Sequence, residues 1–471
     1  MADAAGTAIG DIDRARYEFR TKEKHAVKFE EGLSERTVRE LSELKKEPKW
    51  MLELRLKSFA EFQRRPVPKW GADLGGINFN EISYYLKPEG QQARNWEDVP
   101  AEIKETFEKL GVPEAERKYL AGSLAQFQSE SIYQNLKKQW EEKGVIFTDM
   151  DSALRKYPEI VRKHFLRAVP YTDNKFAALH GAVWSGGTFL YVPDGVRIDL
   201  PLQNYFRMNS AREGMFEHTM LILGKGSKAH YTEGCSAPRY EEASVHSAII
   251  EIFVGEGADA GYTSVQNWSK NVYNLNTKRA LVEKNGRMQW VDGSLGSKVT
   301  MLYPMSVLRG EGASASNYNM TFSSQGSWKD TGAKVVHAAP NTTSKVVAKS
   351  ICMTGGNASY RGLVHINKGA LNAKSAVQCD ALILDEISKT DTYPHNEIYE
   401  PSATVSHEAT VGRISEDHLF YLMSRGLNEE EAKSMIVLGF LEEVLKEVPL
   451  EYSVEFNRLV KLEFSKLGAV G

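Results

Sequence analysis

Glycine turns that recur at an even interval constrain the fold of this chain more than any other feature. From about residue 181, short runs rich in Val, Ile, Tyr, Thr and Phe alternate with glycine turns for more than two hundred residues. The turns at Gly224, Gly255 and Gly286 lie at equal intervals of 31 residues. Such repeated strand–turn units are typical of a solenoid, in which each coil buries its inner face by stacking on its neighbours.

A β-sandwich or β-barrel is the competing interpretation of the same strands. A sandwich of this length would need about twenty strands in one or two units, and the sequence shows no break between units. An elongated β-helix also escapes the size limit on globular cores, which matters for a chain of 471 residues. We therefore predict a mainly β protein whose core, over residues 151–408, is a β-helix.

Helical patterns flank the predicted β-helix on its N-terminal side, over residues 1–150. The segment 34–44 places apolar residues on one face at helical spacing, and a second helix is expected over 51–65. Another helix is expected to open at Pro100 and to close near residue 111, and a long helical pattern then runs on to Gly144. We interpret this region as a charged helical cap or docking domain.

A second helical region is predicted over residues 409–471. Ser415 can cap the first helix, and Asn428 with Glu431 resembles a capping box before the next one. A last helix is expected from residue 451 to about 467. The last two helices carry apolar faces, which either pack against each other or dock a partner protein.

Composition excludes several classes of function. The net charge of −3 gives no general attraction to nucleic acid or to anionic lipid, and no apolar run approaches the ~20 residues that cross a bilayer. The first twenty residues lack the pattern of a secretory signal, and three cysteines are too few for a disulfide-stapled secreted domain. We expect a protein of the cytoplasm. Phosphate-loop, nucleophile-elbow and HExxH motifs are all missing from the sequence.

A polar segment over residues 377–413 gathers Cys379, the two histidines His395 and His407, and glutamates that include Glu397 and Glu408. Thiolate, imidazole and carboxylate are the groups that hold zinc or iron–sulfur clusters. His407 and Glu408 come where the strands are expected to end, so both side chains could reach one site. The spacing matches no standard metal motif, and a core cysteine beside an exposed polar pair is the alternative.

The other two cysteines differ in their surroundings. Cys235 lies between a glycine and a proline turn in EGCSAP, which predicts an accessible thiol that could exchange sulfur or bind metal. Cys352 lies between isoleucine and methionine and is predicted to be packing. A series of polar residues recurs at strand positions, and stacked coils could align them as a channel, although separate hydrogen-bonded residues are the simpler interpretation. The series comprises Arg207, Asn209, Gln266, Trp268 and Lys278.

Several blocks together carry a resemblance to a known family. They are YFRMN, EGCSAP, TSVQNW, YPMSVLRGEG, QCDALIL, HEATVGRI and EDHLFYLMSRGLNEEEAKSMIVLGF. From about Tyr84 to the C-terminus the chain resembles the SufB/SufD family of iron–sulfur cluster assembly proteins, and within it the SufB scaffold type. The resemblance implies a right-handed parallel β-helix flanked by helical regions. It also implies a scaffold, not an enzyme, for de novo iron–sulfur cluster assembly.

The resemblance further implies a set of partners. A SufD-type paralogue and two copies of a SufC-type ABC ATPase would form the complex, with the ATPase docked on the C-terminal helices. Sulfur would arrive as persulfide from a SufS cysteine desulfurase through a SufE- or SufU-type carrier. The finished cluster would pass to apo iron–sulfur proteins. Reduced FAD is implied as an electron source, although no motif in the sequence marks a flavin site.

Roles for individual residues follow from the same resemblance. Cys235 corresponds to the entry site for sulfur, and the polar series above corresponds to the lining of a tunnel. Cys379, with His407 and Glu408 as further ligands, corresponds to the site where a transient cluster, expected to be [4Fe–4S], is built near SufD. Ser406 replaces an acid that some members carry there. The rival hypotheses are a polysaccharide-active β-helix enzyme and a structural adaptor that only docks an ATPase.

Overall fold

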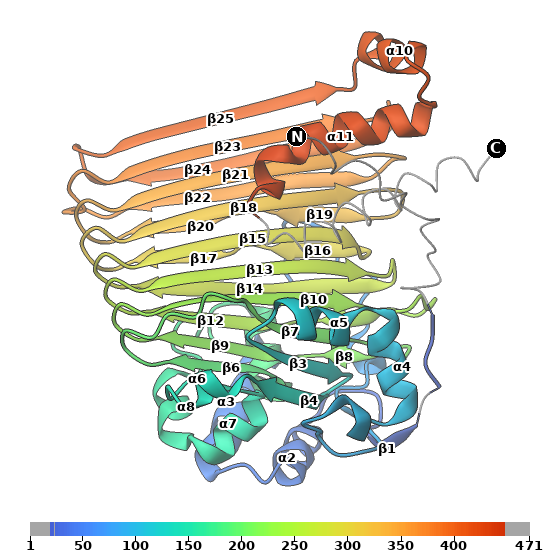
Figure 1. Ribbon diagram of the computed structural model, residues 1–471, viewed down its shortest axis with the longest axis vertical. Helices are drawn as coiled ribbons and strands as arrows, with labels where there is room; N and C mark the ends of the chain where they lie inside the picture. Colours follow the sequence, from blue (N-terminus) through green and yellow to red (C-terminus); the bar gives the residue numbers. More distant parts are fainter. Residues whose placement is uncertain (1–18, 23, 448–471) are drawn as a thin grey trace.

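Two long β-sheets run the length of the molecule in the computed structural model, which describes residues 19–22 and 24–447. One sheet has ten strands and the other thirteen, and nearly all neighbouring strands are parallel. From β6 onward the chain passes back and forth between the two sheets, and its coils stack on one another (Figure 1). The predicted β-solenoid with helical flanks is therefore confirmed.

The ten-stranded sheet contains the cysteine-bearing strands. In spatial order its strands are β25 (Thr404–Arg413), β23 (Lys374–Ile383), β21 (Thr343–Cys352), β18 (Ser314–Ser323), β15 (Arg287–Gly296), β13 (Asp259–Trp268), β10 (Lys228–Ser236), β7 (Leu202–Arg207), β3 (Gly122–Phe127) and β4 (Glu130–Leu136).

The thirteen-stranded sheet forms the opposite wall. In chain order its strands are β5 (Ile146–Thr148), β6 (Gly187–Val192), β8 (Gly214–Met215), β9 (His218–Leu223), β11 (Ser244–His246), β12 (Ile249–Val254), β14 (Val272–Val282), β16 (Val299–Leu302), β17 (Met305–Leu308), β19 (Trp328–Thr331), β20 (Lys334–His337), β22 (Asn357–Ile366) and β24 (Lys389–Ile398).

The repeat in the sequence corresponds to one corner of each coil. A residue with positive φ stands at this corner in six successive coils, and the residue is always glycine or asparagine, which tolerate that conformation. The backbone N–H of each of the first five donates to a carbonyl of the next coil, as Gly226 N does to Glu256 O at 2.8 Å, and that of Asn372 donates to Ser402 Oγ at 2.9 Å. The six residues are Gly226, Gly257, Asn285, Gly312, Asn341 and Asn372.

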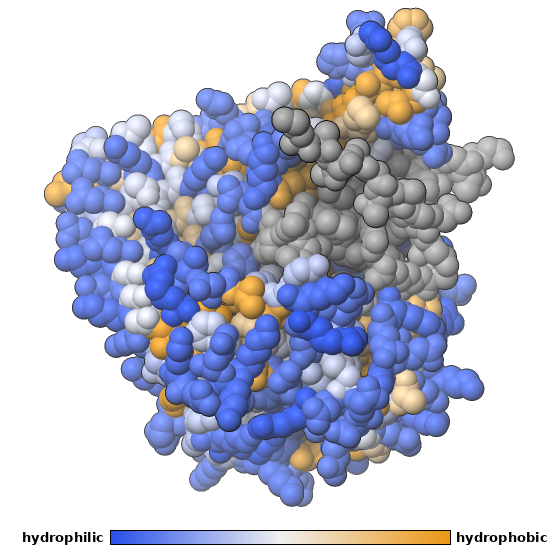
Figure 2. Space-filling model, in the orientation of Figure 1, coloured by the Kyte–Doolittle hydropathy of each residue, from blue (hydrophilic) through white to orange (hydrophobic). Residues whose placement is uncertain are grey.

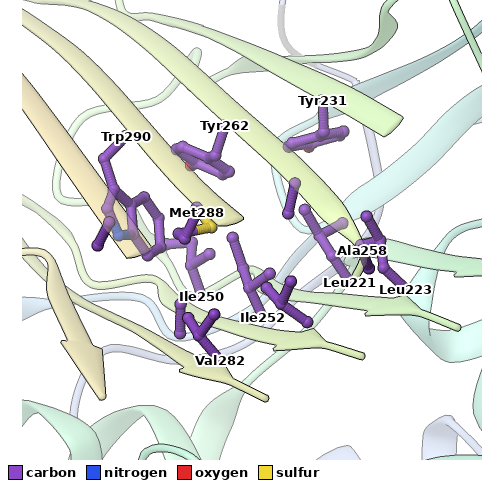
Figure 3. Close-up of a cluster of buried hydrophobic side chains, with 14 of the residues drawn as sticks. Leu221, Leu223, Tyr231, Ile250, Ile252, Ala258, Tyr262, Val282, Met288 and Trp290 are labelled. Atoms are coloured by element: carbon purple, nitrogen blue, oxygen red, sulfur yellow. The ribbon is translucent and has the colours of Figure 1, made fainter. Parts of the chain in front are cut away.

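Apolar side chains fill the corner side of the solenoid interior. The rings of Tyr262 and Trp290 pack edge to face on adjacent coils, with centroids 5.2 Å apart. They lie above Ile250, Ile252 and Val282 from the opposite sheet (Figure 3). All five are at most 1% exposed. Because each side chain contacts those of the coils above and below, the core is one continuous column.

Helices cover the first coils. They are α2 (Glu35–Leu44), α3 (Lys49–Arg64), α4 (Ala101–Lys109), α5 (Val112–Tyr119), α6 (Lys138–Glu141), α7 (Met150–Lys156), α8 (Pro158–His164) and α9 (Lys175–Val183), together with the 3₁₀ turns η1 (Phe79–Glu81) and η2 (Trp96–Asp98) and the antiparallel pair β1 (His25–Lys28) and β2 (Leu86–Pro88). The predicted helices over 34–44, 51–65 and 100–111 are confirmed within a residue or two.

The long helix predicted to run on to Gly144 is wrong. Strands β3 and β4 form an antiparallel hairpin there, and β3 continues the ten-stranded sheet beside β7. All six residues of β3 are buried. A strand covered on both faces lacks the alternation by which strands are recognised in a sequence.

Two helices close the described chain, α10 (Glu416–Ser424) and α11 (Glu429–Leu445). Ser415 caps α10, and Asn428 and Glu431 form the predicted capping box on α11. The apolar face of α11 packs on the outside of the solenoid, through Val437 and Leu441. The helix predicted over 451–467 lies outside the described residues.

Helix α10 stands away from the solenoid (Figure 1). Its aromatic side chains are exposed, Phe420 to 75% and Tyr421 to 57%, and hydrophobic residues gather around it in Figure 2. No helix among the described residues is both long and apolar enough to cross a bilayer.

Candidate functional site

Cys379 and His407 face each other inside the last coils of the solenoid. Cys379 lies on β23 and His407 on β25, the terminal strand of the ten-stranded sheet. The register pairs Cys379 with Ala409, and His407 with Val377, so both side chains point to the same, inner side of the sheet. The Cys379 Sγ lies 3.4 Å from His407 Nε2.

Burial keeps both groups uncharged. It raises the pKa of the Cys379 thiol to about 11, with a smaller contribution from the negative charge of Asp380. It lowers the pKa of His407 below its usual value. The imidazole Nδ1 is buried and has no hydrogen-bond partner within the described part of the chain. A neutral imidazole beside a thiol is a pair of donors that a soft metal ion can take up when the thiol loses its proton.

Glu408 lies on the other face of the strand. The strands were expected to end before His407, but β25 continues to Arg413, so neighbouring side chains point to opposite sides. The Glu408 side chain is exposed outside the solenoid, and only its backbone carbonyl faces Cys379, accepting a hydrogen bond from the thiol at 3.5 Å. The prediction that His407 and Glu408 reach one site from a strand–loop boundary is therefore not met by this geometry.

The other polar residues of the 377–413 segment also lie apart from Cys379. His395 and Glu397 are on the outer side of β24, where Glu397 accepts from His395 at 2.8 Å and contacts His365. No group of three or more His, Cys, Asp or Glu side chains able to hold a metal ion occurs among residues 19–22 and 24–447. The geometry thus brings together two donors, Cys379 and His407.

The last coil leaves this pair at an open end. Within the part of the chain that the structure describes, strand β25 has a neighbour on one side only, and β24 likewise pairs only with β22 (Figure 1). Ala381 and Val411 occupy the same register position one coil apart, yet Ala381 is 8% exposed and Val411 56%. Among the described residues, nothing buries Val411 on the inner face of β25, the face that also carries His407.

Cys235 is deeply buried, contrary to the prediction of an accessible thiol at a turn. Strand β10 continues through Ser236, so Cys235 is an inward-facing strand residue, 1% exposed. Phe206, Met208 and Trp268 pack around it. The glycine and proline that suggested a turn flank the end of a strand, and the turn begins only after Ser236.

Acidic groups surround Cys235. The thiol donates to Glu233 Oε1 at 3.6 Å, and the Tyr262 hydroxyl donates to Glu233 Oε2 at 2.9 Å. Burial, then the charges of Glu233 and Glu217, raise the pKa of the thiol well above its usual value. Burial raises the pKa of Glu233 to about 7, although Lys278 opposes the shift. Cys235 is therefore a protonated thiol beside a carboxyl group that titrates near neutrality.

One line of side chains inside the solenoid joins the two cysteine sites. Four strands separate β10 from β23, and the pairing of each strand with the next places one inward residue of each in a single column. Polar groups occupy the column from the Cys235 end until Ala348, which precedes Cys379. The column consists of Glu233, Ser264, Asp292, Asn319, Ala348 and Cys379.

Three members of the predicted polar series lie on or beside this line. Lys278 reaches across from β14, with its Nζ 3.0 Å from Ser264 Oγ and 2.5 Å from Asp292 Oδ1. Gln266 pairs in register with Cys235, and the Trp268 indole N–H donates to Gln266 at 3.4 Å.

The other two members of the series lie elsewhere. The register that points Phe206 inward toward Cys235 turns Arg207 to the outer face, where its guanidinium donates to the backbone carbonyl of Phe19 at 2.7 Å. Asn209 exchanges hydrogen bonds with the backbone of Thr21. Both hold the segment before β1 against the solenoid.

Sequence reasoning missed part of the interior. Glu217 and His246 form a buried ion pair near Cys235, and the carboxylate raises the pKa of His246 against the effect of burial. Asp292 was missed as well. A signal in the sequence could have found Asp292. It is an ionisable residue on a strand, and the residues two positions before and after it face inward, so it faces inward too. Cys352 is fully buried, as predicted for packing, and donates to Lys389 O at 3.3 Å.

Comparison with known proteins gives one consistent result. Residues 206–440 match the SufBD core domain of SUF system iron–sulfur cluster assembly, and residues 37–204 match the SufBD protein N-terminal region. An iron–sulfur cluster assembly SufBD family protein of Staphylococcus aureus (strain USA300) is 52% identical over 461 residues, covering 98% of this chain and 99% of the relative. A relative from Staphylococcus haemolyticus (strain JCSC1435) with the same family name has the same identity and coverage. The chain belongs to the SufBD family of iron–sulfur cluster assembly proteins.

Proposed function

We propose that this chain is a SufB-type scaffold, which accepts sulfur at Cys235 and builds a cluster at Cys379. The observation that carries the proposal is the single interior column that leads from Glu233, beside the first cysteine, to the second. A thiol at each end of one enclosed polar path is what a protected sulfur relay requires. Family membership favours this role over the polysaccharide-active alternative.

Sulfur uptake at Cys235 would be a thiol–persulfide exchange. The Cys235 sulfur attacks the terminal sulfur of the carrier persulfide, the S–S bond of the carrier breaks, and the carrier thiolate leaves with the electron pair. The proton of Cys235 passes to Glu233, whose carboxylate already accepts the thiol hydrogen. Because Phe206, Met208 and Trp268 enclose the thiol, the exchange requires a movement of the side chains or strands around it.

Cluster assembly at Cys379 would begin on an incomplete ligand set. Iron accepts thiolate and imidazole donors, and Cys379 and His407 supply one of each. A cluster that normally takes four ligands would therefore be held loosely, which suits a scaffold that releases its product. Glu408 can join the set only after β25 changes its conformation, since its carboxylate lies on the outer face.

The open end of the solenoid is where a SufD-type paralogue would complete the site. In the described chain, β24 and β25 offer unpaired strand edges, and Val411 is exposed on the same inner face of β25 as His407. A SufC-type ATPase would dock on α10, whose Phe420 and Tyr421 are exposed. ATP binding by that partner would drive the movements that open Cys235 and rearrange β25.

The remaining expectations rest on the resemblance. The donors would be a SufS desulfurase and a SufE- or SufU-type carrier, the acceptors apo iron–sulfur proteins, and the compartment the cytoplasm. Turning persulfide sulfur into sulfide consumes two electrons, for which reduced FAD is the implied source. The chain itself would carry no enzyme activity, and the ATPase activity would belong to the partner.

Anaerobic reconstitution of the co-expressed complex tests the proposal. The purified complex receives iron and a persulfide donor, and visible absorption with iron and sulfide analysis reports the cluster. A scaffold forms an oxygen-sensitive cluster of about [4Fe–4S] content and transfers it to an apo acceptor. A complex that binds the ATPase but forms no cluster would instead support the structural adaptor.

A further inference from the structure

A cavity of about 570 Å³ lies outside the solenoid, away from both cysteine sites. One wall is the loop over residues 65–70, which directly follows α3. Another wall is formed by residues 173–176 at the start of α9. The outer face of β14, with β17 and β20, forms the floor. The volume is within the range of sites that hold small ligands.

Among the charged side chains of the lining, cations outnumber acids. Five cationic side chains and one carboxylate line the cavity, although the overall net charge of the chain is −3. Lys278 also lines the cavity, but its ammonium points into the solenoid interior. The five are Arg65, Lys69, Lys175, Arg279 and Lys334, and the carboxylate is Asp173.

Two of the cations hydrogen-bond to the backbone, and the other three have N–H groups left to donate to a ligand. Arg65 and Lys175 donate to backbone carbonyls that hold the loop in place. Arg279 donates to Ala168 O and to Asp173, but its Nε is buried without a partner in the described chain. Neither Lys69 nor Lys334 has a carboxylate partner among the described residues.

Lys334 is a partly buried cation whose positive charge is not balanced by a carboxylate of the described chain in contact with it. Its Nζ lies 5.2 Å from the centre of the Tyr303 ring. Burial lowers the pKa of this ammonium, and the nearby charges of Arg279 and Arg361 lower it further, against the effect of Asp173. An anion in the cavity would remove this penalty.

An aromatic side chain stands at the edge of the same cavity. Trp70 is 52% exposed, although it is held between two partners. The Tyr303 ring lies 6.1 Å away, and the Arg361 guanidinium lies 5.5 Å from the indole ring. Arg361 and Tyr303 are in turn fixed by Asp330. A fixed, exposed indole beside unpaired cations is a surface on which a flat ring can stack.

We propose that this cavity binds a nucleotide, with the phosphates at Lys334, Arg279 and Lys69 and the ring against Trp70. The anion would contact Lys334 and Lys69, which have no carboxylate partner in the described chain, and the Nε of Arg279, while the ring covers the exposed indole. This inference is independent of the sulfur relay, because none of these residues contacts either cysteine site.

Isothermal titration of the full-length chain without its partners tests the proposal. Adenosine diphosphate, adenosine and pyrophosphate are titrated separately, and flavin mononucleotide is titrated in parallel to compare a larger ring. We expect ADP or flavin mononucleotide to bind more tightly than adenosine or pyrophosphate. Lys334→Ala and Trp70→Leu should each weaken that binding by about ten-fold, since a charge-assisted contact or a stacked ring is lost.

Controls separate binding from folding. Lys374→Ala removes an exposed lysine on β23, far along the chain from the cavity, and should leave binding unchanged. Lys69→Ala changes an exposed loop residue and should weaken binding even if Lys334→Ala lowers the melting temperature. The proposal is overturned if no nucleotide binds at millimolar concentration. It is also overturned if pyrophosphate binds as tightly as the nucleotides, or if Lys374→Ala weakens binding as much as Lys334→Ala.

Discussion

The two cysteine sites occupy the same solenoid interior but differ in what encloses them. Cys235 lies deep in the sheet, with four strands between its strand and that of Cys379. Phe206 and Trp268 pack around it, and a carboxyl group lies beside its thiol. Cys379 lies one strand from the open end, with an imidazole beside its thiol. Both thiols are protonated at rest, because burial raises the pKa of each.

The neighbouring groups show what each thiol is equipped to do. A carboxylate can take a proton but repels the negative charge of a thiolate, so Glu233 suits a brief exchange at Cys235. A neutral imidazole carries a lone pair for metal, so His407 suits iron at Cys379. Under the proposed function, the closed site would handle sulfur alone, and metal would be handled where a second protein can reach it.

The largest expected effect follows from removing the Cys379 thiol near the open end. Cys379→Ala should abolish cluster formation in the reconstituted complex with either persulfide or free sulfide, because the only thiolate at the open end is lost. Visible absorption and iron content measure the loss. Cys352→Ala is the matched control. Cys352 is also buried, but its thiol donates to the backbone carbonyl of Lys389 and does not face an imidazole. Normal cluster content in Cys379→Ala would return this cysteine to a packing role.

Removing the inner thiol should have an effect that depends on the sulfur source. Cys235→Ala should form almost no cluster from a persulfide donor and a normal amount from free sulfide, which reaches iron without the relay. Acid-labile sulfide analysis compares the two reactions. If free sulfide did not restore the cluster, Cys235 would be needed for more than sulfur delivery, and the contrast between the sites would fail.

The carboxyl group beside Cys235 should set the pH dependence of sulfur uptake. Glu233 accepts a proton only when it is ionised, and its pKa is about 7, so uptake by the wild type should rise as the pH increases through 7. Glu233→Gln should slow uptake by about 10²-fold or more, as for loss of a general base, and should remove this rise. Persulfide loading of Cys235 between pH 6 and 8, followed by mass spectrometry, supplies both readouts. An unchanged pH profile in the variant would contradict the role of Glu233.

A smaller effect is expected at the outer face of β25. Glu408→Gln should reduce cluster yield when ATP is present, because the proposed rearrangement brings this carboxylate to the iron, but should leave more cluster than Cys379→Ala. Iron content with and without ATP measures the difference. Glu397→Gln, an acid on the outer side of β24, is the control. Equal yields in wild type and Glu408→Gln would restrict the ligands to the inner face.

Much of the fold could be predicted because its repeat is local. The positive-φ corner needs glycine or asparagine once in every coil, so the period is visible in the sequence. The capping residues Ser415 and Asn428 likewise marked helix starts correctly. The β3–β4 hairpin could not be recognised, because β3 is buried on both faces and its strand character comes from β7 beside it.

Residue types for the proposed sites could be named from the sequence, but the geometry of those sites could not. Whether Cys235 is exposed depends on where β10 ends, and a glycine and a proline near that end gave the wrong answer. Whether Glu408 joins His407 depends on the length of β25, which is set by pairing with β23. The column from Glu233 to Cys379 depends on the register of six strands, which no local pattern encodes.

Transfer of labelled sulfur between the two cysteines tests the central claim most directly. The complex is given a ³⁵S-persulfide donor without iron, quenched at intervals and digested, and the peptides that carry Cys235 and Cys379 are counted. The account predicts that label appears first on Cys235 and then on Cys379, and that Cys235→Ala leaves the Cys379 peptide unlabelled. Equal labelling of Cys379 in Cys235→Ala would show that sulfur reaches the open end from solvent, and the proposed relay through the solenoid would be wrong.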